Sequence, residues 1–289
     1  LPLSQPTVDV SVEPGQSVKS IAQAVVSSGV DVSPSLLYYF FKFSGQSRLI
    51  RAGSYEIDAQ TSAWQLLTKL VRGEESLKTL TLVEGWTWRQ FRQAMNNSEF
   101  LKHDSNSLSD EEIMSHLGKS DVAPEGRFLP DTYHFSKGSS DLDLLKRAAT
   151  AMDKHLTTAW QNRDLGLPLK NANEALVLAS IVEKETGLSS DRRMIASVFH
   201  NRLRIQMPLQ TDPTVIYGLG ASFDGNLRRA DLQSDHPWNT YVHKGLPPTP
   251  IAMPGVAALE ATLHPATSKA LYFVARGDGS SQFSDNLAD

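Results

Sequence analysis

The 289-residue sequence contains no cysteine. Disulfides, thiolate metal sites and cysteine nucleophiles are therefore excluded together. Long apolar runs are also missing: the longest, residues 36–41 and 175–182, fall well short of the roughly 18 residues that a membrane-spanning helix needs. We therefore expect this chain to be a soluble portion, obtained by processing or by removal of an N-terminal segment.

An excess of basic charge is lacking as well. The net charge is -4 and the isoelectric point is near 6.1, with lysine and arginine scattered along the chain. Nucleic acid is therefore not an expected partner. Nucleotide-binding glycine loops, a serine-hydrolase elbow and metal-ligand spacing among the histidines are absent too, so we expect neither a cofactor nor a metal.

The sequence does contain a compact N-terminal pattern of strands and helices. Alternating valines in residues 8–12 predict a strand, and apolar residues at helical spacing predict a helix over 18–26 that ends before Gly29. A second helix over 34–43, a strand over 53–57 and a third helix over 63–71 follow. Residues 1–76 are therefore expected to form a small α+β module.

Residues 77–289 are expected to form a larger, mixed α+β domain. A strand begins near Thr79, capping-box pairs at Thr87/Gln90 and Ser109/Glu112 predict helix starts, and a long amphipathic helix covers 145–156. Near the end, residues 271–275 predict a buried strand, and residues 277–279 predict a turn leading to Phe283. The predicted fold class is α+β in two parts.

Residues 173–186 predict a helix of about four turns ending at Gly187, because they lack Gly and Pro. At about 100° per residue, Glu185 shares one face with three apolar residues, Leu178, Ile181 and Val182. Glu183 points to a smaller, more polar side, where a solvated or capping role would suffice.

A carboxyl group at the end of an apolar stripe loses hydration, which raises its pKa toward the range of a general acid. Periodicity alone leaves an alternative open, in which Glu185 pairs with a buried arginine or caps the nearby chain. Function has to be read from longer motifs.

Several unusual strings follow one another in the second half of the chain. They are LASIVEKET (178–186), VFHNRL (198–203), LQTDPTVIYG (209–218), NTY (239–241), GLPP (245–248) and PG (254–255). Together with EG (125–126) and LPDTY (129–133), they resemble the endolytic murein transglycosylases, also called the YceG-like family. The first module resembles the LysM domains that the family also carries, although a module without a ligand of its own fits the pattern equally well. Thr249 and Met253 depart from the Gly and Asn that are frequent in the family's proline-rich loop.

The resemblance implies a bacterial envelope enzyme that cleaves inside peptidoglycan glycan strands, between N-acetylmuramic acid (MurNAc) and N-acetylglucosamine (GlcNAc). The product would carry a 1,6-anhydro end, and the catalytic residue of the family falls on Glu185. The resemblance also implies a location at the periplasmic face of the inner membrane, through an N-terminal anchor absent from this chain, and contact with cell-wall synthases of the elongation machinery.

Around Glu185, hydrogen-bonding and aromatic side chains are candidates for holding sugar groups. They are Asn201, Gln210, Thr211, Tyr217, Asn239 and Tyr241. Core packing is the favoured alternative for Tyr217, and capping an equal alternative for the two asparagines.

Asp212, which precedes Pro213, is interpreted as a helix cap in preference to a second catalytic carboxylate. If it were that carboxylate, the enzyme could be a hydrolytic muramidase that activates water. A noncatalytic peptidoglycan-binding scaffold is the other competing function.

Overall fold

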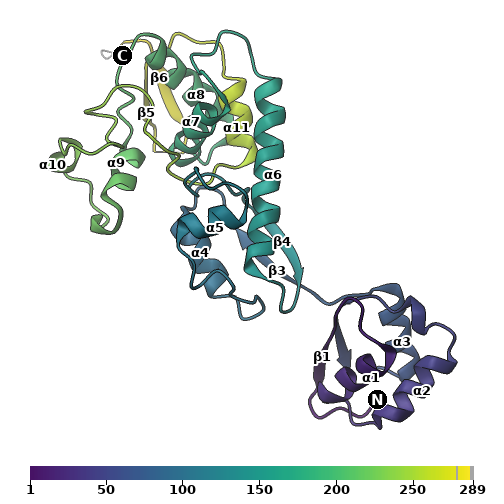
Figure 1. Ribbon diagram of the computed structural model, residues 1–289. Coiled ribbons are helices and arrows are strands. Elements are labelled where there is room, and N and C mark those ends of the chain that lie inside the picture. The colour runs from purple at the N-terminus through teal and green to yellow at the C-terminus, as the bar shows by residue number, and fades with distance from the viewer. Residues whose placement is uncertain (278, 287–289) are drawn as a thin grey trace. The chain divides into compact units, whose positions relative to one another are not determined.

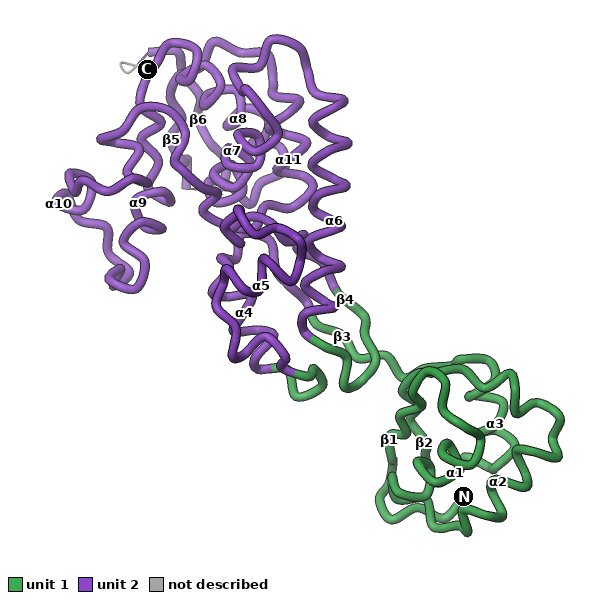
Figure 2. The backbone as a smooth tube through the Cα atoms, viewed as in Figure 1, with its two compact units in different colours: residues 1–80, 98–102, 133–140 green, residues 81–97, 103–132, 141–289 purple. Residues whose placement is uncertain are grey.

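The computed structural model describes residues 1–277 and 279–286, which fold into two compact units (Figures 1 and 2). Unit 1 comprises residues 1–80, 98–102 and 133–140, and unit 2 comprises residues 81–97, 103–132 and 141–289, insofar as they are described. The first unit thus takes in residues 77–80 and two later segments besides the module expected over residues 1–76. Lys102, for example, donates its backbone N–H to the carbonyl of Ser139.

The N-terminal module follows the expected order of strands and helices. Its elements are β1 (Thr7–Val12), α1 (Val18–Ser27), α2 (Pro34–Phe43), the 3-10 turn η1 (Ser47–Leu49), β2 (Gly53–Asp58) and α3 (Ala63–Arg72). β1 and β2 are antiparallel, with Val10 opposite Tyr55. The alternating valines of β1 enter the core because successive strand residues face opposite sides.

Helix ends in this module are set by local chemistry. Ser62 and Gln65 form a capping box at the start of α3, and Gly73 ends that helix in a left-handed conformation with φ of 70°. The core includes Val10, Phe41 and Tyr55, all fully buried. Every buried residue of this core lies before residue 71, so the module has a core of its own.

The rest of the chain is mixed α+β, which confirms the predicted fold class. Its elements are β3 (Leu77–Leu82), α4 (Trp88–Asn96), α5 (Asp110–His116), β4 (Asp131–Ser136), α6 (Asp141–Gln161), α7 (Ala172–Glu185), α8 (Ser189–Arg204), α9 (Asp212–Leu219), η2 (Gly220–Ser222), α10 (Arg229–Leu232), α11 (Val256–Leu263), β5 (Tyr272–Ala275) and β6 (Ser281–Ser284). β3 pairs with β4, and β5 pairs antiparallel with β6. Both predicted capping boxes form, at Thr87/Gln90 and Ser109/Glu112.

Helix α7 is the central element of unit 2. It packs against α6, α8, α9 and α11, and residues 175–182 are all buried. Figure 1 shows α7 between these neighbours. Ala179 and Ser180, on the side of this helix that is smaller and more polar, are buried too, because neighbouring helices cover α7 on several sides. This side is therefore not solvated.

The C-terminal strand was expected to be buried, and this is also wrong. β5 has no fully buried residue, and Val274 is 68% exposed. Pairing with β6 covers only an edge of β5, and among its side chains Phe273 packs edge-on against the buried ring of Phe199. The predicted turn at residues 277–279 includes Asp278, which lies outside the described residues.

Candidate active site

Glu185 is the last residue of α7. The helix ends because Thr186 adopts an extended conformation, with φ of -148°, and Gly187 does not form the left-handed cap that its position predicted. The side chain of Glu185 is half-buried and accepts a hydrogen bond from the hydroxyl of Thr211. The carboxyl group therefore lies between the end of the central helix and the segment that begins α9.

The surroundings of Glu185 favour its protonated form. Burial raises the pKa most, the hydrogen bond from Thr211 lowers it, the charge of Asp212 raises it, and the charge of Arg202 lowers it, with a raised pKa as the net result. The C-terminal position on α7 acts in the same direction as burial, because the negative end of the helix dipole disfavours a carboxylate. A raised pKa keeps this carboxyl group protonated to a higher pH than an ordinary glutamate, as a general acid requires.

Thr211 is held in place by backbone and side-chain contacts. Its N–H donates to the hydroxyl of Thr240 over 3.1 Å, and its carbonyl accepts from the hydroxyl of Thr214 over 2.7 Å. The preceding segment is fixed by Arg202, which donates to the carbonyl of Leu209. The donor to Glu185 is thus positioned by buried groups before any substrate binds.

Asp212 does not cap α9, so the favoured interpretation of this residue is wrong. Thr211 is the N-cap, and Asp212 is the first helical residue. Its Oδ1 accepts from the phenol of Tyr241 over 2.6 Å. The preference for a cap assumed that Pro213 is the first helical residue, whereas the helix begins one residue earlier and directs the carboxylate toward Tyr241.

The six predicted sugar-binding residues have different surroundings. Thr211 and Tyr241 lie beside Glu185 and Asp212 respectively, and Gln210 is exposed with φ of 50°. Asn201 donates to the carbonyls of Ser268 and Ala270. These contacts fit the capping alternative for Asn201.

Asn239 is fully buried, and its amide donates to three carbonyl groups of residues 231–234. Its Oδ1 accepts from the N–H of Tyr241 over 2.9 Å. The side chain therefore fixes the loop that carries Tyr241, which also fits the structural alternative.

Glu183 is not solvated, contrary to one of the roles expected for it. Its side chain is 6% exposed, lies 3.7 Å from Arg192, and accepts from the N–H of Gly255 over 2.8 Å. Gly255 is the N-cap of α11. Glu183 thus stabilises the start of α11, where a negative charge is favoured by the helix dipole.

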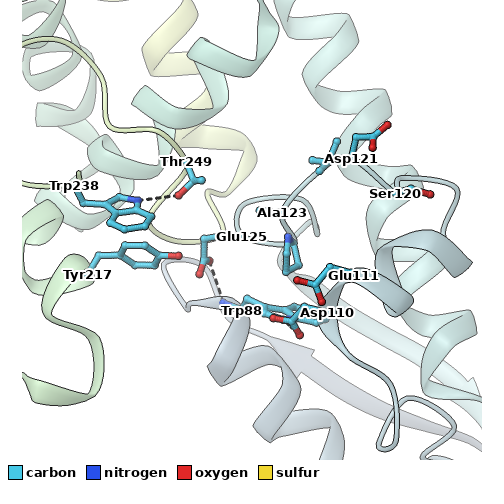
Figure 3. A pocket seen from close by; sticks show the side chains of 12 residues that line it. Trp88, Asp110, Glu111, Ser120, Asp121, Ala123, Glu125, Tyr217, Trp238 and Thr249 are labelled. Carbon is cyan, nitrogen blue, oxygen red and sulfur yellow. Dashed lines mark hydrogen bonds between the residues drawn. The ribbon is translucent and has the colours of Figure 1, made fainter. Parts of the chain in front are cut away.

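A second buried carboxyl group, Glu125, lines a pocket that sequence reasoning did not predict (Figure 3). The pocket has a volume of about 460 Å³, and Glu185 is not among its lining residues. Glu125 is 6% exposed and accepts from the backbone N–H of Trp88 over 3.0 Å. The phenol of Tyr217 points toward this carboxyl group (Figure 3).

Burial raises the pKa of Glu125 to about 7, although the nearby N–H groups of Trp88 and Gly126 and the phenol of Tyr217 favour the charged form. In the sequence, Glu125 stood out only as part of a motif of the resembled family. Its partners lie 37 and 92 positions away, so no local pattern could have predicted the pocket.

Tyr217 and Trp238 form one wall of this pocket, with ring centroids 5.7 Å apart in an edge-to-face arrangement. The indole N–H of Trp238 donates to the hydroxyl of Thr249 over 2.9 Å. Thr249, one of the two departures from the family's loop, therefore anchors an aromatic ring of the wall.

In the described part of the chain, no three His, Asp or Glu side chains are grouped as a metal site would require, and no helix is both long and apolar enough to cross a membrane.

Comparison with known proteins identifies the family of this α+β chain. The sequence profile of the YceG-like family matches residues 10–289, so the chain belongs to the YceG-like family. It is 32% identical to the endolytic murein transglycosylase of Bacillus subtilis (strain 168), over 99% of this chain and 83% of that protein. It is 29% identical to the endolytic murein transglycosylase of Streptococcus pneumoniae serotype 2 (strain D39), over 99% of this chain and 57% of that protein.

A solved structure agrees with this assignment. The crystal structure of a YceG-like protein from Listeria monocytogenes superposes with a TM-score of 0.57 and 29% sequence identity. The match covers 98% of this chain and 97% of the Listeria chain.

Proposed function

We propose that this chain is an endolytic lytic transglycosylase that cleaves the MurNAc–GlcNAc bond within peptidoglycan strands, with Glu185 as its catalytic acid and base. The observation that carries the proposal is the environment of Glu185. It is a desolvated carboxyl at the end of the central helix, hydrogen-bonded by Thr211, and its pKa is raised. The names of the relatives from Bacillus and Streptococcus support the same substrate.

The reaction begins when protonated Glu185 donates its proton to the glycosidic oxygen. The bond from that oxygen to C1 of MurNAc breaks through an oxocarbenium-like transition state, and GlcNAc leaves with a new hydroxyl. The Glu185 carboxylate then takes the proton of the C6 hydroxyl of the same MurNAc, whose oxygen attacks C1. The ring closes as a 1,6-anhydro sugar, the acid is restored and no water is consumed. The C6 hydroxyl is already part of the bound sugar, so its effective concentration is high.

A hydrolytic muramidase is the second candidate function, and the charge of Asp212 beside Glu185 is the observation that favours it. A second carboxylate could activate water for attack on C1. Asp212 already accepts a hydrogen bond from the phenol of Tyr241, which favours a role in positioning Tyr241 over the role of a catalytic base.

The proposed site of action is the periplasmic face of the bacterial inner membrane, where nascent peptidoglycan lies. A membrane anchor outside this chain and contact with cell-wall synthases belong to the same proposal, and both rest on the resemblance to the family.

The test is digestion of purified peptidoglycan, followed by mass spectrometry of the products, with the wild type beside Glu185→Gln. We expect anhydro ends, lighter than ordinary reducing ends by one water, and a rate loss of roughly 100-fold or more in the variant because the proton donor is lost. Ordinary reducing ends would establish the hydrolase instead. A wild type that releases no products would indicate a noncatalytic scaffold, and undiminished cleavage by Glu185→Gln would show that another group is the catalytic acid.

A further inference from the structure

Helix α9 links the Glu185 site to the Glu125 pocket. Its N-cap, Thr211, donates to Glu185, and Tyr217 contacts Glu125 farther along the same helix. At 1.5 Å per residue, these two positions are about 9 Å apart along the helix axis. Both carboxyl groups are therefore contacted from within two turns of one helix.

The loop that precedes α11 forms a second connection between the Glu185 site and the Glu125 pocket. Thr249 contacts Trp238 in the pocket, and the N–H of Ile251 donates to Ser180 of α7 over 3.0 Å. Farther on, the N–H of Gly255 donates to Glu183, two residues before the acid. The pocket is thus attached to the same helix that carries Glu185.

The pocket has the composition of a saccharide site. Two aromatic rings form one wall, and Glu125 lies between this wall and Trp88 (Figure 3). Ring faces pack against the apolar C–H faces of sugars, whereas carboxyl groups bind their hydroxyls and amides. The side chain of Glu125 is buried among protein groups and yet lines the cavity, so its position is fixed before a ligand arrives.

We propose that the Glu125 pocket is a subsite that binds a sugar of the glycan strand adjacent to the sugars cleaved at Glu185, with Trp238 and Tyr217 as its wall. Glu125 forms a hydrogen bond with a hydroxyl or N-acetyl group of that sugar. The subsite rests on the proposed function, since its ligand is the substrate of Glu185. Its contribution is binding energy that is the same in the ground state and in the transition state, without a step in bond cleavage.

The first experiment measures binding without cleavage. Purified, uncrosslinked glycan strands are titrated into Glu185→Gln by calorimetry, and Trp238→Ala or Glu125→Gln is added to this background. We expect Trp238→Ala to weaken binding roughly tenfold, since an aromatic contact is lost. Glu125→Gln should cause a smaller loss of affinity for the strands. Glutamine keeps an acceptor for the N–H of Trp88, so this variant tests the pocket even if Trp238→Ala fails to fold.

A matched control accompanies these variants. Leu165→Ala shortens a side chain that is 95% exposed and does not line the pocket. It should bind strands as the parent does. Unchanged affinity in both Trp238→Ala and Glu125→Gln would overturn the subsite.

The second experiment uses the active enzyme. Loss of a subsite should raise KM and leave kcat near its original value, because uniform binding is removed. A collapse of kcat in Glu125→Gln with KM unchanged would place Glu125 in the chemistry and overturn the proposal.

The two experiments separate this proposal from the proposed function. If the wild type releases no products but glycan strands bind in a way that depends on Trp238, the proposed enzymatic function is refuted and the proposed subsite is supported. Cleavage by wild type, together with pocket variants that bind and react normally, would refute only the subsite.

Discussion

At the scale of single residues, the charge state of Glu185 depends on two neighbours with opposite effects. The hydroxyl of Thr211 stabilises the carboxylate, whereas the negative charge of Asp212 destabilises it. Glu185 as the proposed general acid works only while it is protonated, so on this proposal the rate should fall as pH rises through the pKa of Glu185. The high-pH limb of the pH–rate profile therefore reports this pKa.

Thr211→Val and Asp212→Asn should move this limb in opposite directions. Loss of the Thr211 hydroxyl raises the pKa of Glu185 and extends activity to higher pH, whereas loss of the Asp212 charge lowers the pKa and shifts the limb to lower pH. The measurement is kcat/KM across pH for both variants, with Asp235→Asn as a control, because Asp235 is a mostly exposed carboxylate that pairs with His243. Shifts of the same sign in both variants would contradict this assignment.

At the scale of elements, α9 depends on a glycine in an unusual way. Gly218 lies inside the helix, where alanine is ordinarily better by about 1 kcal/mol. A Cβ at this position would collide with the ring of His236. The position of α9 against the 231–239 loop thus requires the absence of a side chain.

Gly218→Ala should destabilise unit 2 by roughly 1–3 kcal/mol, the usual cost of overpacking, instead of stabilising it. Urea unfolding followed by tryptophan fluorescence measures this, since four of the five tryptophans lie in unit 2. Gly187→Ala is the matched control: its added Cβ meets no atom within 4 Å and φ is not positive, so stability should change little. A more stable Gly218→Ala would show that His236 moves freely.

Elements with local signals were predicted well from the sequence. α2 begins and ends at the expected residues, and the box at Thr87 and Gln90 forms because its partners are three positions apart. The site was predicted only in part. Glu185 and Thr211 do meet, but the contact between Asp212 and Tyr241 joins residues 29 positions apart. Such pairs depend on how loops pack, which periodicity does not encode.

At the scale of the whole molecule, the N-terminal module has a self-contained core. Its buried residues run from Val8 to Leu70, and its two strands pair with each other. Residues 1–76, produced alone, should therefore fold and show a cooperative thermal transition by circular dichroism. The loss of Lys137, which pairs with Asp9 over 2.7 Å, should lower its stability only slightly, since exposed ion pairs contribute little. A fragment without a cooperative transition would mean that the later segments are needed for folding.

Arg202 joins two distant parts of the chain through one guanidinium group. It donates to the carbonyl of Leu271, just before the C-terminal hairpin, and to the carbonyl of Leu209, just before Thr211. Proteolytic nicking near Leu271 would release one of these anchors and loosen the other. Damage near β5 and β6 would thus lower activity while leaving the proposed catalytic group, Glu185, chemically intact.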